Sequence, residues 1–164
     1  MPITPFHFGP GVLFASVAPR RVSFVAFVAA NCITDVESIY NILRGNYPVH
    51  AFLHTFAGAT LVIVMTLALF LAMRRLAQRV PLPDWLRWRR LTPAAVVVGA
   101  ALGSYSHIVL DGVMHADMRP FAPWSQANPF LHRVPLGALH LGCVVAAIAG
   151  GLLWWFLARR NPQV

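Results

Sequence analysis

Long apolar runs dominate the chain and predict helices that cross a membrane. A helix needs roughly 20 mostly apolar residues to span the hydrocarbon core of a bilayer. Four runs reach that length, at about 22–42, 51–73, 94–115 and 137–158. A shorter apolar piece, residues 10–18, is followed by Pro19, and we expect it to form a short helix that folds back as a hairpin. The pattern therefore predicts an all-α, polytopic helical bundle with four transmembrane helices, forming a single membrane-embedded domain over residues 1–164.

The composition agrees with a membrane protein and argues against nucleic-acid binding. Hydrophobic residues make up 58% of the chain and charged residues 11%, whereas soluble domains carry about 25% charged residues. The net charge of +8 could suggest a nucleic-acid partner, but all 13 basic residues are arginines that cluster at the ends of apolar runs. Such clusters set the orientation of membrane helices, so the expected partners are membrane lipids.

The arginines fall mostly on one side of the predicted membrane. Ten of them precede the first run, follow the last run or lie in the loop 74–93; they are Arg20, Arg21, Arg74, Arg75, Arg79, Arg87, Arg89, Arg90, Arg159 and Arg160. By the positive-inside rule, this side is the cytoplasm. We therefore expect a multi-pass protein of the inner (plasma) membrane, with both ends of the spanning bundle and the basic loop in the cytoplasm.

Ionisable residues gather at the opposite, extracytoplasmic ends of the runs. In the third run, "SYSHIVLDGVMHAD" places His107, Asp111 and His115 at steps of four. Further candidates lie near the same level in the other runs: Asp35, Glu37, His50, His54 and His140. Ionisable residues inside a membrane are costly and mark functional sites by default.

His7 joins this level if the short N-terminal helix folds back. His7 lies fourteen residues before Arg21, and Asp35 lies fourteen residues after it. At ~1.5 Å per helical residue, both would lie ~21 Å above the turn. The hairpin therefore predicts that His7 belongs to the same cluster as the other candidates.

The types and spacing of these residues predict a metal site. Residues four apart share one face of a helix, so we expect His50 with His54, and His107 with Asp111 and His115, to point in common directions. Imidazole and carboxylate ligands together suit zinc, manganese or iron. We expect a divalent metal, with zinc favoured, bound as one or two ions. Such a metal lowers the pKa of water to about 7 and supplies a nucleophile.

Several short motifs resemble one family of membrane proteins. The segment "SHIVLDGVMHADMRPFAPWS", together with "TPFHFGPG" and "ITDVES", is similar to the membrane-bound metal-dependent hydrolases, also described as LexA-binding, inner-membrane-associated hydrolases. The resemblance implies that the metal ligands are His7, Asp35, His54, His107 and Asp111. The His-x-x-x-Asp pattern is also similar, more distantly, to zinc-dependent phospholipases C.

Residues 50–55, at the start of the second apolar run, depart from the family pattern. The family is expected to read His-Arg-Gly-x-Thr-His there, whereas this chain reads "HAFLHT". The resemblance therefore assigns no role to His50, and His115 has no counterpart in it.

The expected activity is metal-dependent hydrolysis of an ester or phosphoester in a lipid or lipid-linked substrate. His115 or Glu37 would be the general base or a further ligand, and His140 a ligand or its supporting partner. Arg119 would clamp a phosphate, while His132 is expected to face solvent. Two alternatives stay open: a haem-binding electron carrier that uses paired histidines, and a transporter of metal or protons.

Overall fold

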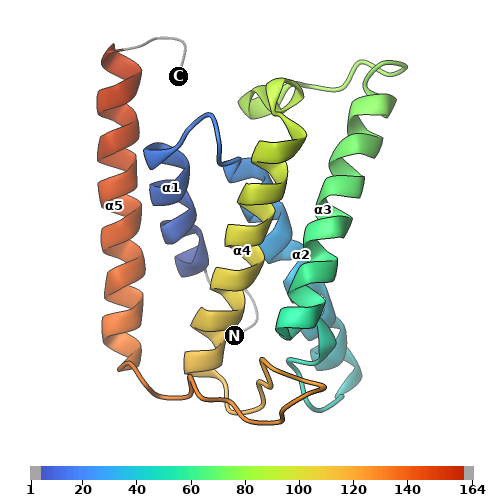
Figure 1. The fold of residues 1–164 in the computed structure, drawn as a ribbon, viewed down its shortest axis with the longest axis vertical. Helices are drawn as coiled ribbons and strands as arrows, with labels where there is room; N and C mark the ends of the chain where they lie inside the picture. The colour runs from blue at the N-terminus through green and yellow to red at the C-terminus, as the bar shows by residue number, and fades with distance from the viewer. Residues whose placement is uncertain (1–4, 161–164) are drawn as a thin grey trace.

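The chain is all-helical over residues 5–160, which are the residues that the computed structural model describes (Figure 1). This confirms the predicted fold class. The α-helices are α1 (Phe8–Val17), α2 (Phe24–Arg44), α3 (Phe56–Leu76), α4 (Pro93–Met114) and α5 (Leu136–Arg160). Three short 3-10 helices are η1 (Pro5–His7), η2 (Phe52–His54) and η3 (Trp85–Arg90).

Three of the helices, α3, α4 and α5, are long and apolar enough to cross a membrane. α2 is also 21 residues long, but its buried face carries polar side chains, among them Asn31, Asp35 and Ser38. These polar side chains lower the mean hydropathy of α2, although they are buried inside the bundle. The predicted length and apolar character of a membrane-spanning helix are therefore confirmed for three helices, while the crossing by α2 and the N-terminal hairpin stay predictions.

Side-chain caps set the starts of the long helices. Ser23, Thr55 and Thr92 each accept a hydrogen bond from the backbone N–H three residues later, at 3.1, 2.9 and 3.1 Å. Such caps satisfy one of the free N–H groups at a helix start. The prediction that the second run is helical from residue 51 is wrong, because α3 begins only after Thr55, at Phe56.

α2, α3 and α4 form the part of the bundle that carries most of the buried side chains. Its core is made of small residues, including Ala26, Ala30, Val62 and Ala100. α4 approaches α2 closely, since a Cβ atom on Gly99 would lie 2.2 Å from the carbonyl oxygen of Ser23. Small residues at such crossings allow close packing where no water drives association.

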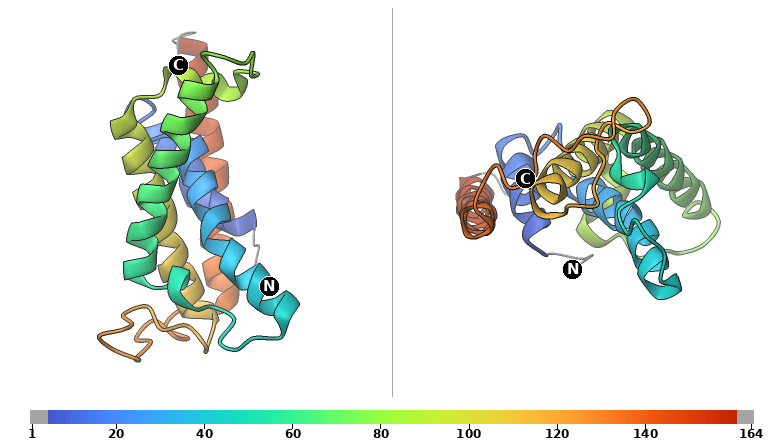
Figure 2. Two further views of the ribbon diagram at one scale, coloured as in Figure 1. Left: turned by 90° about the vertical axis from the view of Figure 1, so that its right-hand side faces the viewer. Right: turned by 90° about the horizontal axis from the view of Figure 1, so that it is seen from below.

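α5 lies at the edge of the molecule and packs mainly against α1 (Figures 1 and 2). Two glycines make this contact. A Cβ atom on Gly9 would lie 2.1 Å from the carbonyl oxygen of Cys143, and one on Gly150 would lie 2.6 Å from the backbone nitrogen of Leu13. The remaining surface of α5 is exposed and apolar, with Leu141 63% exposed, as expected for a helix that faces lipid.

The basic segments lie together at one end of the bundle. The turn between α1 and α2, the connection between α3 and α4, and the C-terminal end of α5 are all at the top of Figure 1. Eight of the ten arginines predicted to be cytoplasmic belong to these segments, and the other two, Arg74 and Arg75, lie in the last turn of α3. At the other end lie the connections 45–55 and 115–135.

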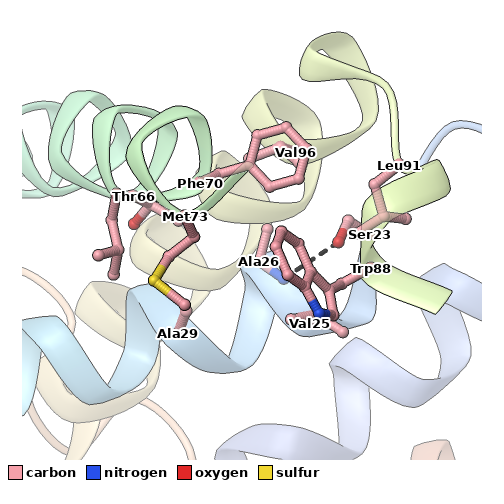
Figure 3. A pocket seen from close by; sticks show the side chains of 11 residues that line it. Ser23, Val25, Ala26, Ala29, Thr66, Phe70, Met73, Trp88, Leu91 and Val96 are labelled. Atoms are coloured by element: carbon pink, nitrogen blue, oxygen red, sulfur yellow. Dashed lines mark hydrogen bonds between the residues drawn. The ribbon is translucent and has the colours of Figure 1, made fainter. Parts of the chain in front are cut away.

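An apolar pocket of about 240 Å³ lies near this basic end (Figure 3). It is lined by the start of α2, the second half of α3 and the residues around η3, with Phe70, Met73 and Trp88 among them. Its lining residues carry no ionisable group, so this pocket offers no acid, base or metal ligand. The chemistry predicted from the sequence belongs at the opposite end.

Candidate metal centre

Four buried side chains from α2, η2 and α4 come together at the end of the bundle opposite the basic segments. Asp35, His54, His107 and Asp111 each offer a ligand atom, and these atoms all lie within 4.8 Å of one another. His54 and His107 are fully buried, and Asp35 and Asp111 are 5% and 2% exposed. The cluster could hold a metal ion, as the residue types and spacing predicted.

The ring nitrogens of the two histidines lie close to the carboxylate oxygens of the two aspartates. The Nε2 atom of His107 lies 3.3 Å from Oδ1 of Asp35 and 3.2 Å from Oδ2 of Asp111. The Nε2 atom of His54 lies 3.8 and 3.7 Å from the same two oxygens. In a tetrahedral zinc site with bonds of about 2.0–2.1 Å, neighbouring ligand atoms are about 3.3 Å apart. The four nitrogen–oxygen separations of 3.2–3.8 Å therefore lie within about 0.5 Å of that spacing.

Two of these atoms have no hydrogen-bond partner within the described residues. They are Oδ1 of Asp35 and Nε2 of His107, both shielded from solvent. Burying an unpaired carboxylate or ring nitrogen is costly. A bound cation would compensate for both atoms at once, so the residues present fit a metal ion.

Asn31 fixes the orientation of His107. Its Nδ2 group donates to the carbonyl oxygen of Phe27 at 2.9 Å, so its Oδ1 atom is the one that faces Nδ1 of His107, at 2.9 Å. The ring nitrogen on that side carries the proton and donates. In the neutral ring, the Nε2 atom then carries no proton and is directed at the two carboxylates, and this is the tautomer that binds a metal.

Glu37 fixes the segment that carries His54. Its two carboxylate oxygens accept hydrogen bonds from the backbone N–H groups of Phe52 and Leu53, at 3.1 and 2.6 Å. Its Oε2 atom also lies 4.0 Å from Nδ1 of His54. The carboxylate is thus engaged in holding η2, which favours a positioning role over the general-base role that the sequence suggested.

His7 lies beside the four-atom cluster, as the sequence predicted. Its Nε2 atom is 3.1 Å from Oδ1 of Asp111, and its ring centroid is 4.5 Å from that of His107. His7 therefore approaches Asp111 from the side that His107 and His54 leave free.

His140 and Arg119 lie outside the cluster. The His140 ring stacks on Phe6, with centroids 4.5 Å apart and planes at 24°. The exposed Arg119 donates from Nη1 to Oε1 of Gln126 at 2.8 Å, in the connection at the same end of the bundle. His132 is exposed, as expected. The roles predicted for His140 and Arg119 stay predictions.

The rings of His50 and His115 are in contact, but neither residue lies within a helix as predicted. His50 precedes η2 in a non-helical stretch, and His115 is the C-cap of α4, with φ −114° and ψ 122°. The prediction of shared helix faces is therefore wrong for both residues. Their rings nevertheless stack, with centroids 4.2 Å apart and planes at 26°. With Asp111 they form a second group of ligand atoms within 4.8 Å of one another.

Asp117 is a site residue to which the sequence reasoning assigned no role. Its Oδ2 atom accepts from the backbone N–H groups of Val49 and His50, at 2.9 and 3.0 Å. Its Oδ1 atom lies 2.9 Å from Nδ1 of His50. The only local signal is its position two residues after His115, because its partners are remote in the sequence.

The environment of His50 and His115 favours the neutral form of both rings. Burial lowers the pKa of His50, as does the neighbouring His54, and these effects outweigh the Asp117 carboxylate. Burial and the proximity of His50 lower the pKa of His115. Burial raises the pKa of Asp117, but the hydrogen bonds from the backbone and ring of His50 bring it below its usual value. Neutral imidazoles are the form that binds metal.

No family model, curated protein or solved structure matches the chain. The resemblance to membrane-bound metal-dependent hydrolases stays a prediction.

Proposed function

We propose that this protein is an integral membrane metal-dependent hydrolase. Its substrate would be an ester or phosphoester of a lipid or lipid-linked molecule at the extracytoplasmic face of the inner membrane. Asp35, His54, His107 and Asp111 would hold a divalent cation, with zinc favoured and manganese or iron as alternatives. The observation that carries this proposal is the separation of 3.2–3.8 Å between the carboxylate oxygens and ring nitrogens.

The mixture of ligands favours a hydrolytic metal over haem or a transport path. Two carboxylates balance the charge of a divalent cation, and two neutral imidazoles complete a four-ligand set. An axial haem pair would need no carboxylates. A transport path would need polar groups along its whole length, whereas the pocket at the other end of the bundle is lined without ionisable groups.

When bound, a divalent cation supplies Lewis acidity and a nucleophile from water at neutral pH. The chain's own residues would prepare the site for this chemistry. Asn31 holds Nε2 of His107 towards the carboxylates, and Glu37 holds the backbone of η2. His115, half-buried and close to Asp111, would be the general base or a further metal ligand.

The location favours a lipid-linked substrate. The cluster lies at one end of a bundle with exposed apolar side chains along its helices, among them Leu69 in α3 and Val109 in α4. A substrate held in the membrane could approach laterally while its headgroup reaches the end of the bundle. Arg119, exposed at the same end, could bind a phosphate through its guanidinium group.

Elemental analysis of detergent-purified protein tests the metal. We expect bound zinc in the wild type, and its loss from His107→Ala and Asp111→Ala. His132→Ala is the matched control, because this exposed histidine belongs to neither group of ligands, and it should keep the metal. Equal metal content in all four proteins would overturn the proposal.

A hydrolysis screen with ester and phosphoester lipids tests the reaction. We expect the wild type and His132→Ala to release product and His107→Ala to release none. A Soret band in the purified protein would favour the haem carrier instead. Metal or proton transport into proteoliposomes without hydrolysis would favour the transporter.

A further inference from the structure

Beside the four-atom cluster lies a second set of ligands that it does not use. His50 and His115 are held in a stacked pair, and each offers a ring nitrogen within 4.8 Å of Asp111. Asp111 therefore belongs to both groups. A carboxylate that is common to two sets of histidine ligands is the arrangement needed to bridge two cations.

His50 is prepared as a ligand in the same way as His107. Its Nδ1 atom lies 2.9 Å from Oδ1 of Asp117, which orients the ring and places the proton on that side. The other nitrogen, Nε2, is buried and has no hydrogen-bond partner within the described residues. His50 is only 6% exposed, so water does not satisfy this atom readily. Histidines that bind metals usually donate one ring N–H to a carboxylate, which orients the ring and leaves the second nitrogen for the metal.

His50 and His115 lie on the wall of a cavity, whereas the shared Asp111 is buried and is not among the residues that line it. The cavity has a volume of about 410 Å³ and is lined by His50, His115 and Asp117, by their neighbours Val49 and Ala116, and by Ile42 and Tyr47. Ile42 and Tyr47 are 47% and 79% exposed, so the rim is partly apolar. A phosphate headgroup could enter this cavity while its lipid chains remain beside the rim.

We propose that His50, His115 and Asp111 form a second divalent-cation site, with Asp111 bridging it to the first. Asp117 is the positioning residue that holds His50. This inference rests on the proposed function and extends it, since the second ion would be the one that meets the phosphoester in the cavity. Two-metal sites with ions about 3.5–4 Å apart are typical of phosphoester hydrolysis.

Zinc stoichiometry on the full-length chain in detergent tests the second site. We expect two zinc ions per wild-type chain, one in His50→Ala or His115→Gln, and two in the His132→Ala control. One ion in the wild type, unchanged by His50→Ala, would overturn the second site and leave the proposed function intact. No ion in the wild type would overturn both. Two variants are used because His115, at the end of α4 and half-buried, can be replaced with less disturbance than His50.

Loading with cobalt(II) separates a bridged pair from two independent sites. We expect magnetic coupling between the two ions in the wild type and its loss in His50→Ala, where one ion remains. Asp117→Asn should keep the coupled spectrum at saturation but weaken the second binding step by about 10–100-fold. A purely structural role for Asp117 would lower both binding steps equally, and that result, or an uncoupled wild type, would contradict the proposal.

Discussion

Nδ1 of His107 lies 2.9 Å from Oδ1 of Asn31, in the interface between α4 and α2 where both side chains are buried. Asn31 can only accept in this hydrogen bond, because its amide nitrogen already donates to the carbonyl oxygen of Phe27. The ring must donate from Nδ1, so in its neutral form the other nitrogen faces Asp35 and Asp111 without a proton. One uncharged residue outside the ligand set thereby prepares the site for a cation.

We expect Asn31→Leu to weaken zinc binding by about 10–100-fold, which is the usual effect of losing the partner of a histidine ligand. The ligands themselves remain, so the number of ions bound at saturation should stay the same. Competition with a chromophoric chelator measures the affinity. Asn46→Ala, at an exposed asparagine, is the control, and an affinity of Asn31→Leu equal to the control would contradict this account.

Metal binding should raise the thermal stability of the protein. A ligand that binds only the folded state stabilises it by about 2.7 kcal/mol at one hundred times its dissociation constant. Scanning fluorimetry in detergent should therefore show a higher Tm with zinc than with a chelator. In Asp111→Ala, which lacks the carboxylate shared by both groups, zinc should leave Tm unchanged; an equal rise in this variant would place the binding elsewhere.

Replacement of Glu37 distinguishes a positioning residue from a general base. Glu37→Ala leaves the N–H groups of Phe52 and Leu53 without their acceptors, and we expect a loss of about 1–3 kcal/mol of stability. His54 should then be displaced, so zinc affinity should fall as well. Glu37→Gln keeps one acceptor oxygen and should lose less of both. Unchanged zinc affinity in Glu37→Ala, with hydrolysis abolished, would instead support the general-base role.

The contact between α1 and α5 is tested by two neighbouring glycines. A Cβ atom on Gly150 would meet the backbone of Leu13 at 2.6 Å, whereas one on Gly151 has nothing within 4 Å. Overpacking typically costs about 1–3 kcal/mol, so Gly150→Ala should lower the free energy of unfolding by that amount. Gly151→Ala, on the same helix, should not lower it. Equal stability of the two variants in denaturant titrations would argue against this packing.

Cysteine labelling tests the predicted orientation and the crossing by α2. In a Cys32→Ala/Cys143→Ala background, a membrane-impermeant maleimide should label Gln126→Cys and Asn46→Cys from outside intact cells. It should reach Gln78→Cys and Arg21→Cys only after permeabilisation. All four positions are exposed, so burial does not explain a difference. External labelling of Arg21→Cys would show that α2 does not cross.

The helices and one pair of ligands could be predicted because they depend on local pattern alone. Long apolar runs require membrane-length helices whatever their neighbours. His107 and Asp111 share a face of α4 because four residues make about one helical turn. Asp35 could be placed at their level by counting along α2. These three residues are in the metal group that the structure brings together.

The errors arise where a remote contact decides the local structure. The stretch 51–54 is apolar enough to continue α3, but Glu37 on α2 takes two of its N–H groups. The pairing of Asp117 with His50 joins residues 67 apart in the sequence. The position of His140 near the extracytoplasmic end of its helix could be predicted by counting residues. The direction of its side chain depends on how α5 packs against α1.

The stretch from Val49 to Leu53 is fastened at both ends by acids that belong to other parts of the chain. Asp117 holds the N–H groups of Val49 and His50, and Glu37 holds those of Phe52 and Leu53. The coordinates of His50 and His54 are therefore dictated by two external anchors and not by the turn geometry of the stretch itself. We therefore expect loss of either acid to displace the histidine nearest to it while the other ring keeps its place.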